Sequence, residues 1–508
     1  MKAKIKRILV ANRGEIAIRV IRACHDAGIM AVAVYSDCDR TAYHVRLADE
    51  VYYLGPSPAR DSYLNQEKII QIAKKSAADA IHPGYGFLAE NSEFAKLCED
   101  NEIIFVGPKS STIAKLGDKL EARRTAVKAG LPVVPGTDFD IRDLKKVLSD
   151  ARKIGFPVLV KAAAGGGGKG MRIVNSEDRL TESIESASRE AGSAFGDGRV
   201  YLEKYLERPR HIEMQILADI HGNVVYLGER ECSIQRRHQK VIEETPSPVV
   251  TPELRARMGK AAVSLAHESG YIGAGTVEFL VDQKLNFYFL EVNTRLQVEH
   301  PVTELVTGID LVREQFRIAE GQPLSFKQAD IRPRGHAIEC RVYAEDPRND
   351  FMPSTGTISE YREPSGPGVR VDSGVVAGSE IPVYYDPIIA KLVVWGRDRP
   401  EAIERTRRAL LEYRMSGVLT TIGFADSVMQ SKRFRSGDYT TDFIDIEFPD
   451  RNFEGPEADQ TTRAAIAAII YDHLHREKIS VTFKKGPEGR GGWVHYYRQE
   501  GLKRMGQT

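Results

Sequence analysis

The chain has 508 residues and a nearly balanced charge, with 72 Lys and Arg against 71 Asp and Glu. A chain of this length exceeds one ordinary hydrophobic core, so two to four domains are expected. The balanced charge provides no overall field that would attract nucleic acid or an anionic membrane. Any anion must therefore be bound by a local group of residues.

No stretch of the sequence approaches the length of a membrane span, and we expect a cytoplasmic protein. The cysteines are odd in number and include no CxxC pair, which argues against a disulfide framework and against a zinc site. We expect them to be reduced core residues. They are Cys24, Cys38, Cys98, Cys232 and Cys340.

The first part of the chain alternates short apolar runs with helical patterns. This alternation predicts a parallel sheet covered on both faces and ending near Gly117. The turn after the first strand lacks GxGxxG, so a dinucleotide is not indicated. HPGYGF (82–87) places two glycines around Tyr85 after a strand, where open sheets bind ligands. A tight structural turn explains these residues equally well.

A second unit begins after PVVPG (132–136) and contains FPVLVKAAAGGGGKGMRIV, predicted to be a strand, a glycine run and a strand. Four consecutive glycines are costly unless the backbone must approach a ligand closely. The NH groups around Lys169 would suit phosphate oxygens. A Walker A motif is excluded because Gly170 follows the Lys, and a Rossmann turn because a strand follows the loop. A flap over phosphates, with Lys161 at the same end, and a flexible surface loop remain as alternatives.

Two further segments of this unit carry candidate ligand contacts. Residues 203–206 (EKYL) join two predicted strands, where they either offer backbone groups to a ligand or stay solvated. A dense basic group follows, with no interleaved aromatic residues that would indicate nucleic-acid binding. We expect it to form an anion pocket opposite Glu278 and Glu291, with a solvated loop as the alternative. Its members are Arg236, Arg237, His238 and Lys240.

The segment FLEVNTRLQVEHP (289–301) is polar at every odd position from Glu291 to Glu299. On an extended backbone these side chains share one face. The preceding run pairs with TVEFLVD (276–282) as a predicted hairpin that sets Asp282 against Phe287 and Glu278 against Glu291. Opposed carboxylates repel, so a Lys, an Arg or a hard cation such as Mg²⁺ or Mn²⁺ is expected between them. A solvated edge hairpin is the alternative.

Residues 302–319 are predicted to form one amphipathic helix, and a third unit begins near Gly335. There GHAIECRVYAEDP reads as a strand with Glu339 and Arg341 on one face, and residues 386–395 as another strand. Beyond position 450 we expect a linker, a helix over 461–474 and a strand pair, SVTF and GWVHYY. This tail is too small for a core of its own.

Six motifs occur in an order and spacing that closely resemble biotin carboxylase, the ATP-grasp component of acetyl-CoA, propionyl-CoA and pyruvate carboxylases. The likeness covers roughly residues 4–447. The motifs are HPGYGFLAEN, KAAAGGGGKGM, QRRHQKVIEE, GTVEFL, EVNTRLQVEHPVTE and ECRVYAEDP.

The resemblance implies a mixed α/β and α+β fold. An N-terminal parallel-sheet (pre-ATP-grasp) domain would span 1–117, and a C-terminal biotin carboxylase domain would span 334–447. Between them an ATP-grasp domain would span 118–323, with a mobile glycine-rich lid at about 134–205. Residues 450–508 lie outside the likeness and are expected to dock on the main body or on a partner.

The resemblance also implies residue roles. Glu278, Glu291 and Asn293 would hold Mg²⁺ or Mn²⁺. Bicarbonate would be bound by Lys240, Arg295, Gln297 and the Val298 backbone, with Glu299 as the general base. The Val298 backbone contact implies that the second half of the 289–301 segment is a shaped loop rather than a strand. Biotin would lie near Tyr85, with Arg341 stabilising its enolate. ATP would be bound by Lys119, Lys161, Gly165, Gly166, Gly167, Gly168, Lys169, Gly170, Glu203, Lys204, Leu206, His211, Gln235, His238, Glu278 and Glu291.

By the same resemblance the chain would carboxylate biotin at the expense of ATP. The sequence has no AMKM-like biotinylation site, so biotin is expected on a carrier protein or domain of another chain. We also expect a homodimer and, on another chain, a carboxyltransferase subunit. Of the possible complexes, a two-subunit pyruvate carboxylase is slightly favoured. The alternative function is another ATP-grasp carboxylate ligase or an enzyme that forms carbamoyl phosphate.

Overall fold

The structure is a computed structural model that describes residues 4–137, 144–162, 171–451, 453 and 465–472. The chain divides into two compact units, Met1–Phe453 and Glu454–Thr508. In the second unit the described residues form a helix over 465–472 with exposed side chains, which confirms part of the predicted helix. The predicted strands SVTF and GWVHYY lie outside the described residues. Within the described ranges, no helix is long and apolar enough to cross a membrane.

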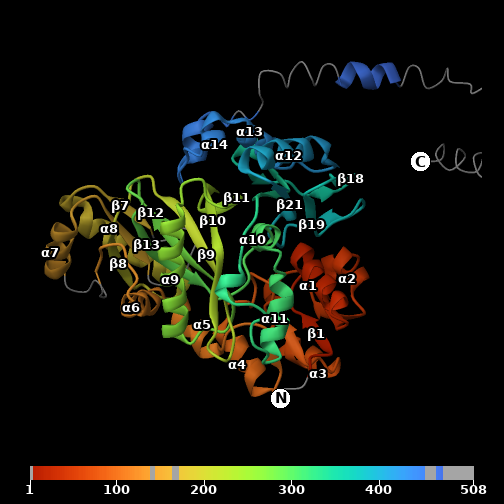
Figure 1. Cartoon of the computed structure of the whole chain (residues 1–508), viewed down its shortest axis with the longest axis horizontal. Helices are drawn as coiled ribbons and strands as arrows, with labels where there is room; N and C mark the ends of the chain where they lie inside the picture. The colour runs from red at the N-terminus through yellow and green to blue at the C-terminus, as the bar shows by residue number, and fades with distance from the viewer. Residues whose placement is uncertain (1–3, 138–143, 163–170, 452, 454–464, 473–508) are drawn as a thin grey trace, which may run out of the picture. The chain divides into compact units, whose positions relative to one another are not determined.

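The N-terminal part contains a parallel sheet with the strand order β3-β2-β1-β4-β5 (Figure 1). Its elements are β1 (Arg7–Val10), α1 (Gly14–Asp26), β2 (Met30–Ser36), α2 (Tyr43–Leu47), β3 (Glu50–Gly55), α3 (Gln66–Lys75), β4 (Ala80–His82), α4 (Ser92–Asp100), β5 (Ile104–Phe105), α5 (Ser110–Gly117) and α6 (Lys119–Lys128). In β1, Ile8 and Val10 pack against α1, whereas Leu9 packs against α3 and α4. The predicted parallel sheet with helices on both faces is confirmed.

A small antiparallel sheet in the order β7-β6-β8 flanks the glycine run. Its elements are α7 (Leu144–Ile154), β6 (Val158–Ala162), β7 (Arg172–Val174), α8 (Leu180–Phe195) and β8 (Val200–Lys204). The pairing of Val158 with Val174 confirms the predicted strands on either side of residues 163–170. Residues 163–170 themselves, which include the predicted ligand glycines and Lys169, lie outside the described residues.

An eight-stranded antiparallel sheet in the order β13-β12-β9-β10-β11-β14-β21-β19 forms the centre of the first unit (Figure 1). Its elements are β9 (Arg210–Ala218), β10 (Val224–Arg236), β11 (Gln239–Thr245), β12 (Gly273–Val281), β13 (Phe287–Asn293), β14 (His336–Tyr343), β19 (Val369–Ser373) and β21 (Ile388–Gly396). The strand after Gly335 is β14, and it pairs with β11. Residues on either side of the predicted boundary therefore share one sheet.

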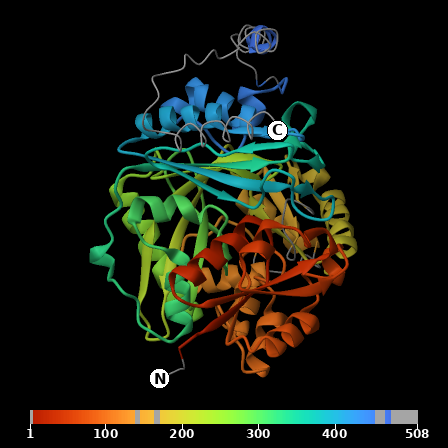
Figure 2. The ribbon, with the colours of Figure 1, turned by 90° about the vertical axis from the view of Figure 1, so that its right-hand side faces the viewer.

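Helices cover this sheet at both ends. Met258 and Ala262 of α9 (Pro252–Ser269) pack on Met214 and Ile216 of β9. At the other end, helices pack over β14 and β21 (Figure 2). The remaining elements are β15 (Glu345–Asp346), β16 (Met352–Pro353), β17 (Gly356–Thr357), β18 (Glu360–Arg362), β20 (Glu380–Ile381), α12 (Arg399–Glu412), β22 (Arg414–Ser416), α13 (Ile422–Gln430), α14 (Lys432–Ser436) and α15 (Phe443–Glu447).

The predicted hairpin is the pair β12 and β13, and Glu278 lies opposite Glu291 as predicted. The predicted pairing of Asp282 with Phe287 is wrong, because Phe287 pairs with Val281. A bulge between Glu278 and Phe279 absorbs the difference of one residue. A bulge of this kind re-aims side chains locally, and here it adjoins a candidate metal ligand.

The predicted helix over 302–319 is two helices, α10 (His300–Thr307) and α11 (Leu311–Ala319). Gly308 ends α10 with a left-handed φ of 73°. Asp310 then caps α11, because its side chain accepts a hydrogen bond from the backbone NH of Arg313. The apolar period continued across the break, so only the Gly and Asp signals could have revealed it.

Candidate active site

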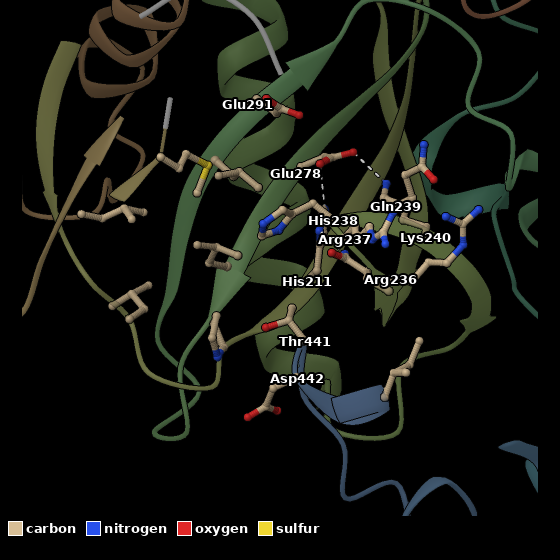
Figure 3. A pocket seen from close by; sticks show the side chains of 18 of the residues that line it. His211, Arg236, Arg237, His238, Gln239, Lys240, Glu278, Glu291, Thr441 and Asp442 are labelled. Atoms are coloured by element: carbon tan, nitrogen blue, oxygen red, sulfur yellow. Dashed lines mark hydrogen bonds and ion pairs between the residues drawn. The ribbon is translucent and has the colours of Figure 1, made fainter. Parts of the chain in front are cut away.

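One cavity of about 850 Å³ brings most of the predicted site residues together (Figure 3). Of those that the structure describes, only Glu299 and Tyr85 are absent from its walls. The predicted residues lining it are Lys119, Lys161, Glu203, Lys204, Leu206, His211, Gln235, His238, Lys240, Glu278, Glu291, Asn293, Arg295, Gln297, Val298 and Arg341.

One part of the cavity is apolar and is lined by Met171, Ile173, Leu280 and Leu290. The segment 203–206 borders it, as predicted for a hinge that contacts a ligand. The side chain of Lys204 is not free for such a contact, since its Nζ donates to the carbonyls of Gly155 and Phe156 at 2.8 and 3.0 Å. Backbone groups of this segment are thus the better candidates for binding a flat polar ring.

Beside this apolar part lie two lysines from separate elements, Lys119 at the start of α6 and Lys161 in β6. Lys161 Nζ is 3.0 Å from Glu203 Oε2, and Arg123 contacts the other oxygen of Glu203 at 3.2 Å. Burial lowers the pKa of Lys119, although the Glu291 carboxylate acts in the opposite direction. Buried Lys161 and half-buried Lys119 on the wall of one cavity suit a polyanion such as a phosphate chain.

Glu278 is the centre of a hydrogen-bonded network. Its Oε1 accepts from Lys240 Nζ at 2.8 Å, from Asn293 Nδ2 at 2.7 Å and from Gln297 Nε2 at 3.1 Å. Its Oε2 lies 2.7 Å from His211 Nε2, and both cationic contacts are drawn in Figure 3. Burial opposes ionisation, but Lys240 and His211 outweigh it and hold the pKa of Glu278 below its usual range.

The pKa of Glu291, the carboxylate opposite Glu278, is shifted in the other direction. Burial raises the pKa of Glu291, and the charge of Glu278 adds to the rise. The two carboxylates therefore resist being ionised together without a cation between them. Two carboxylates and the amide of Asn293 are hard oxygen donors that fit Mg²⁺ or Mn²⁺, so the residues present suit a divalent metal at this face.

The predicted extended face does not continue past Asn293, where β13 ends. Residues 294–299 form a loop, so the extended row ends at Asn293 and the shaped loop that the resemblance implied for the second half is confirmed. Arg295 is held by Glu90, whose Oε2 lies 2.7 Å from Arg295 Nε. The guanidinium also donates to Gln297 Oε1 at 2.9 Å and to Asn293 Oδ1 at 3.1 Å. The loop thus brings Arg295, Gln297 and Glu299 closer together than an extended strand would place them.

Glu299 lies beneath the cavity wall and is fully buried at the start of α10. Its Oε1 accepts from Lys240 Nζ at 2.8 Å, and its Oε2 accepts from Arg341 at 3.0 Å. Burial opposes ionisation, but Lys240 and Arg341 outweigh it and hold the pKa of Glu299 well below the usual range. Lys240 therefore links the metal face at Glu278 directly to Glu299.

The basic group predicted as an anion pocket is divided. Lys240 points into the network, whereas Arg236 pairs with Glu345 and Arg237 pairs with Asp350. Arg237 and His238 form the turn of the β10–β11 hairpin with positive φ of 47° and 65°. All four residues nevertheless line the same cavity as Glu278 and Glu291, as predicted, so their binding of an anion stays a prediction.

Three comparisons with known proteins bear on this site. The N-terminal residues 4–113 match the family model "Biotin carboxylase, N-terminal domain". Residues 118–327 match "Carbamoyl-phosphate synthase L chain, ATP binding domain", and residues 339–446 match "Biotin carboxylase C-terminal domain". Together these models cover most of the chain. The chain belongs to the biotin carboxylase family.

Relatives and solved structures of the family match most of the length of this chain. A pyruvate carboxylase subunit of Methanothermobacter thermautotrophicus is 57% identical over 86% of this chain and 89% of its own. Biotin carboxylase of a Nostoc species is 53% identical over 87% of this chain and 99% of its own.

Among solved structures, one similar chain is the biotin carboxylase domain dimer of Hydrogenobacter thermophilus 2-oxoglutarate carboxylase, in complex with MgADP, ADP and bicarbonate. It is 50% identical, covers 90% of this chain and 100% of its own, and has a TM-score of 0.85. A biotin carboxylase from Campylobacter jejuni in complex with β-γ-ATP is 46% identical over 87% of this chain and 99% of its own, with the same TM-score.

Several residues of this biotin carboxylase site were not expected from the sequence. Glu213 is fully buried between Arg230 and Lys240 and contacts both. Glu243 accepts from Arg341 Nε at 2.7 Å, and burial raises the pKa of Glu243 to about 7. A signal for Glu213 was present, because polar His211, Glu213 and Gln215 alternate with apolar residues along β9.

Tyr85, the predicted biotin contact, lies in the turn after β4 and is absent from the cavity walls. Its hydroxyl hydrogen-bonds to Glu15, and its ring centroid is 5.9 Å from Lys391 Nζ. The HPGYGF segment is also a tight turn, since Gly84 and Gly86 have φ of 64° and 66°. The two interpretations of this segment are therefore compatible.

Proposed function

We propose that the chain transfers the carboxyl group of bicarbonate to biotin through carboxyphosphate, at the expense of ATP, and that the predicted residues perform the steps. One observation carries these assignments. Lys240 touches Glu278 on the metal face and Glu299 beside Arg341, so a nucleotide, a small anion and a third substrate would meet within one network.

ATP would lie along the cavity with its adenine in the apolar part beside residues 203–206. Its phosphates would then reach Lys119, Lys161 and the glycine run. Glu278 and Glu291, with Asn293 beside them, would hold Mg²⁺ or Mn²⁺, which would supply positive charge to the phosphate oxygens during transfer. His211, Gln235 and His238 border the same cavity and would complete the nucleotide site.

Bicarbonate would bind to Lys240 and Arg295, with Gln297 and the Val298 backbone as further contacts. The low pKa of Glu299 makes it a weak base while Lys240 and Arg341 pair with it. An anion that takes a share of the Lys240 charge raises the pKa of Glu299, so substrate binding itself prepares the base.

Glu299 then accepts the bicarbonate proton, and the freed oxygen attacks the γ-phosphorus in line with the leaving ADP. The product carboxyphosphate breaks down to CO₂ and phosphate. Phosphate takes the ureido proton of biotin, whose nitrogen attacks CO₂. Arg341 stabilises the negative charge of the enolate, since its guanidinium lies at the cavity wall and is held in place by Glu243 and Glu299.

Phosphate release from ATP tests this proposal. Phosphate release by the unaltered chain should require bicarbonate and should be stimulated by free biotin. Glu299→Ala and Arg341→Ala should each lower the biotin-dependent rate by about 100-fold or more. The control is Arg60→Ala, since that side chain is 92% exposed and should leave the rate unchanged. Biotin-dependent turnover retained in both site variants would disprove the assignment.

The match of residues 118–327 to a carbamoyl-phosphate synthase ATP-binding model supports a second candidate, an ATP-grasp enzyme that forms carbamoyl phosphate or joins another carboxylate. The same assay distinguishes the two. Phosphate release that responds to ammonia or an amino acid and ignores biotin would favour the second candidate.

We further propose that biotin arrives on a carrier from another chain and that a carboxyltransferase subunit consumes the carboxybiotin. The relative named as a pyruvate carboxylase subunit supports pyruvate as the final acceptor. We also propose a homodimer and the domain division 1–117, 118–323, 334–447 and 450–508. Purification of the native complex, followed by ¹⁴C-bicarbonate transfer to pyruvate, acetyl-CoA or propionyl-CoA in parallel, tests the acceptor and partners. Label found only in an acyl-CoA product would exclude pyruvate.

A further inference from the structure

Lys391 of β21 is a lysine whose side chain has no exposed surface and which is absent from the cavity walls. Its Nζ donates to the backbone carbonyl of Val298 at 3.0 Å and lies 3.1 Å from Glu15 Oε2. Asp372 is a more distant partner at 3.8 Å. Burial of a lone ammonium is very costly, so these contacts are required to keep the charged side chain in place.

The carbonyl of Val298 needs this partner. Glu299 is the residue that precedes α10, so the Val298 carbonyl lies before the helix and outside its hydrogen-bond ladder. The same carbonyl belongs to the peptide that joins Val298 to Glu299. Fixing its direction therefore fixes the Val298 backbone and the point from which the Glu299 side chain leaves the chain.

The other contact of Lys391 leads to the predicted biotin side. Glu15 of α1 accepts the hydroxyl of Tyr85, and the Tyr85 ring lies beside Lys391 Nζ at 5.9 Å. Tyr85 itself has intermediate exposure, whereas Glu15 is 2% exposed. Lys391 thus contacts the loop at 294–299 (the bicarbonate loop) directly, and it is linked to Tyr85 through the carboxylate of Glu15.

We propose that Lys391 is a positioning residue that aligns the bicarbonate site with the biotin site by holding the Val298–Glu299 peptide and, through Glu15, the ring of Tyr85. This inference rests on the proposed roles of Val298, Glu299 and Tyr85. Lys391 belongs to a strand that enters the central sheet nearly 100 residues after the bicarbonate loop. Its position therefore depends on the C-terminal strands being docked.

The test compares KM values for bicarbonate, free biotin and ATP in the full-length chain. Lys391→Met combined with Glu15→Gln removes both charges together, so that no unpaired ion is left buried. We expect the KM for bicarbonate and the KM for biotin to rise about tenfold, the equivalent of one lost hydrogen bond to a charged group. The KM for ATP should change less than twofold.

Glu15→Gln alone separates the two halves of the inference. It removes one charged partner of Lys391 but leaves the Lys391–Val298 bond and Asp372 in place, and it alters the link to Tyr85. The KM for biotin should therefore rise several-fold while the KM for bicarbonate stays within twofold. The control removes another ion pair outside the cavity wall, that of half-buried Arg255 with buried Glu229, as Arg255→Met with Glu229→Gln. That variant should lose stability with all three KM values unchanged.

A double variant with unchanged KM values for bicarbonate and biotin would overturn the inference. If that variant does not fold, an unchanged KM for biotin in Glu15→Gln would overturn it. Equal rises in all three KM values would also contradict it, since they indicate a general loss of structure. Failure of the proposed function itself is recognised separately, because the unaltered chain would then show no bicarbonate- and biotin-dependent turnover.

Discussion

Buried carboxylates surround Arg341, and their pKa values are shifted in different directions, lowered for Glu299 and raised for Glu243 and Glu339. Glu339 lies directly opposite Glu243 across β14 and β11, and neither oxygen of Glu339 has a hydrogen-bond partner. Burial raises the pKa of Glu339 well above its usual range, and the charge of Glu243 adds to the rise while Lys391 opposes it. Burial and the lack of a hydrogen-bond partner for either oxygen therefore favour the neutral form of Glu339.

Glu339→Gln should accordingly keep activity within about twofold. The folded protein retains a proton that unfolded glutamate releases above a pH of about 4.3, so this residue makes stability fall as the pH rises towards its raised folded pKa. The variant lacks that proton. Its advantage in unfolding free energy over the unaltered chain should grow from pH 5 to pH 8 by up to about 1.4 kcal/mol per pH unit.

Urea unfolding at pH 5 and pH 8 measures this difference. Exposed Glu360→Gln is the control and should show no such trend. A constant offset between Glu339→Gln and the unaltered chain at both pH values would show that Glu339 is ionised in the folded state.

At the scale of elements, the short helix α10 carries Glu299 at its start. α10 has only eight residues, with Glu299 just before its start and Gly308 just after its end. A helix this short depends on its caps and on packing, since few internal hydrogen bonds hold it. The packing is provided by Val302 and Val306 against Ala337 and Val393 of the sheet.

Gly308→Ala should lower the unfolding free energy by about 1 kcal/mol, because an L-residue is strained at the left-handed φ of 73°. No atom would obstruct the new Cβ, so the backbone alone accounts for the loss. Gly423→Ala is the matched control, since Gly423 lies within α13 with open space around it and should gain stability. Equal effects of the two substitutions in thermal unfolding would contradict this explanation.

At the scale of the whole first unit, ion pairs join the bicarbonate loop to distant parts of the chain. Glu90, after the HPGYGF turn, accepts from the Thr294 backbone NH at 3.0 Å and from Arg295 at 2.7 Å. Lys391 contacts the other end of the loop from the C-terminal strands. The loop between the metal face and α10 is thus held from both sides.

Glu90→Gln should raise the KM for bicarbonate about two- to fivefold with the KM for ATP unchanged, which is the effect of a partly exposed pair. The difference should shrink at high salt, because exposed charges are screened. Glu93→Gln on the neighbouring helix is the control. A KM for bicarbonate that stays the same at low salt would show that Glu90 does not orient Arg295.

Local patterns in the sequence were sufficient to predict several elements of the fold and one pair of site residues. The alternation of strands and helices predicted the parallel sheet, and the hairpin between β12 and β13 predicted that Glu278 lies opposite Glu291, although a bulge corrects its register. Both follow from backbone geometry over a few residues. The family resemblance supplied residues that share one cavity although they lie far apart in the chain.

Only the tertiary structure decided the partners of those residues. Glu213, Arg230, Glu243 and Lys391 lie on four different strands, and they approach the loop at 294–299 only because those strands belong to one sheet. Charge sign alone could not pair them, since the chain offers more than seventy residues of each sign. Burial is what makes the pairing specific, because a buried charge tolerates no distant or solvated substitute for its partner.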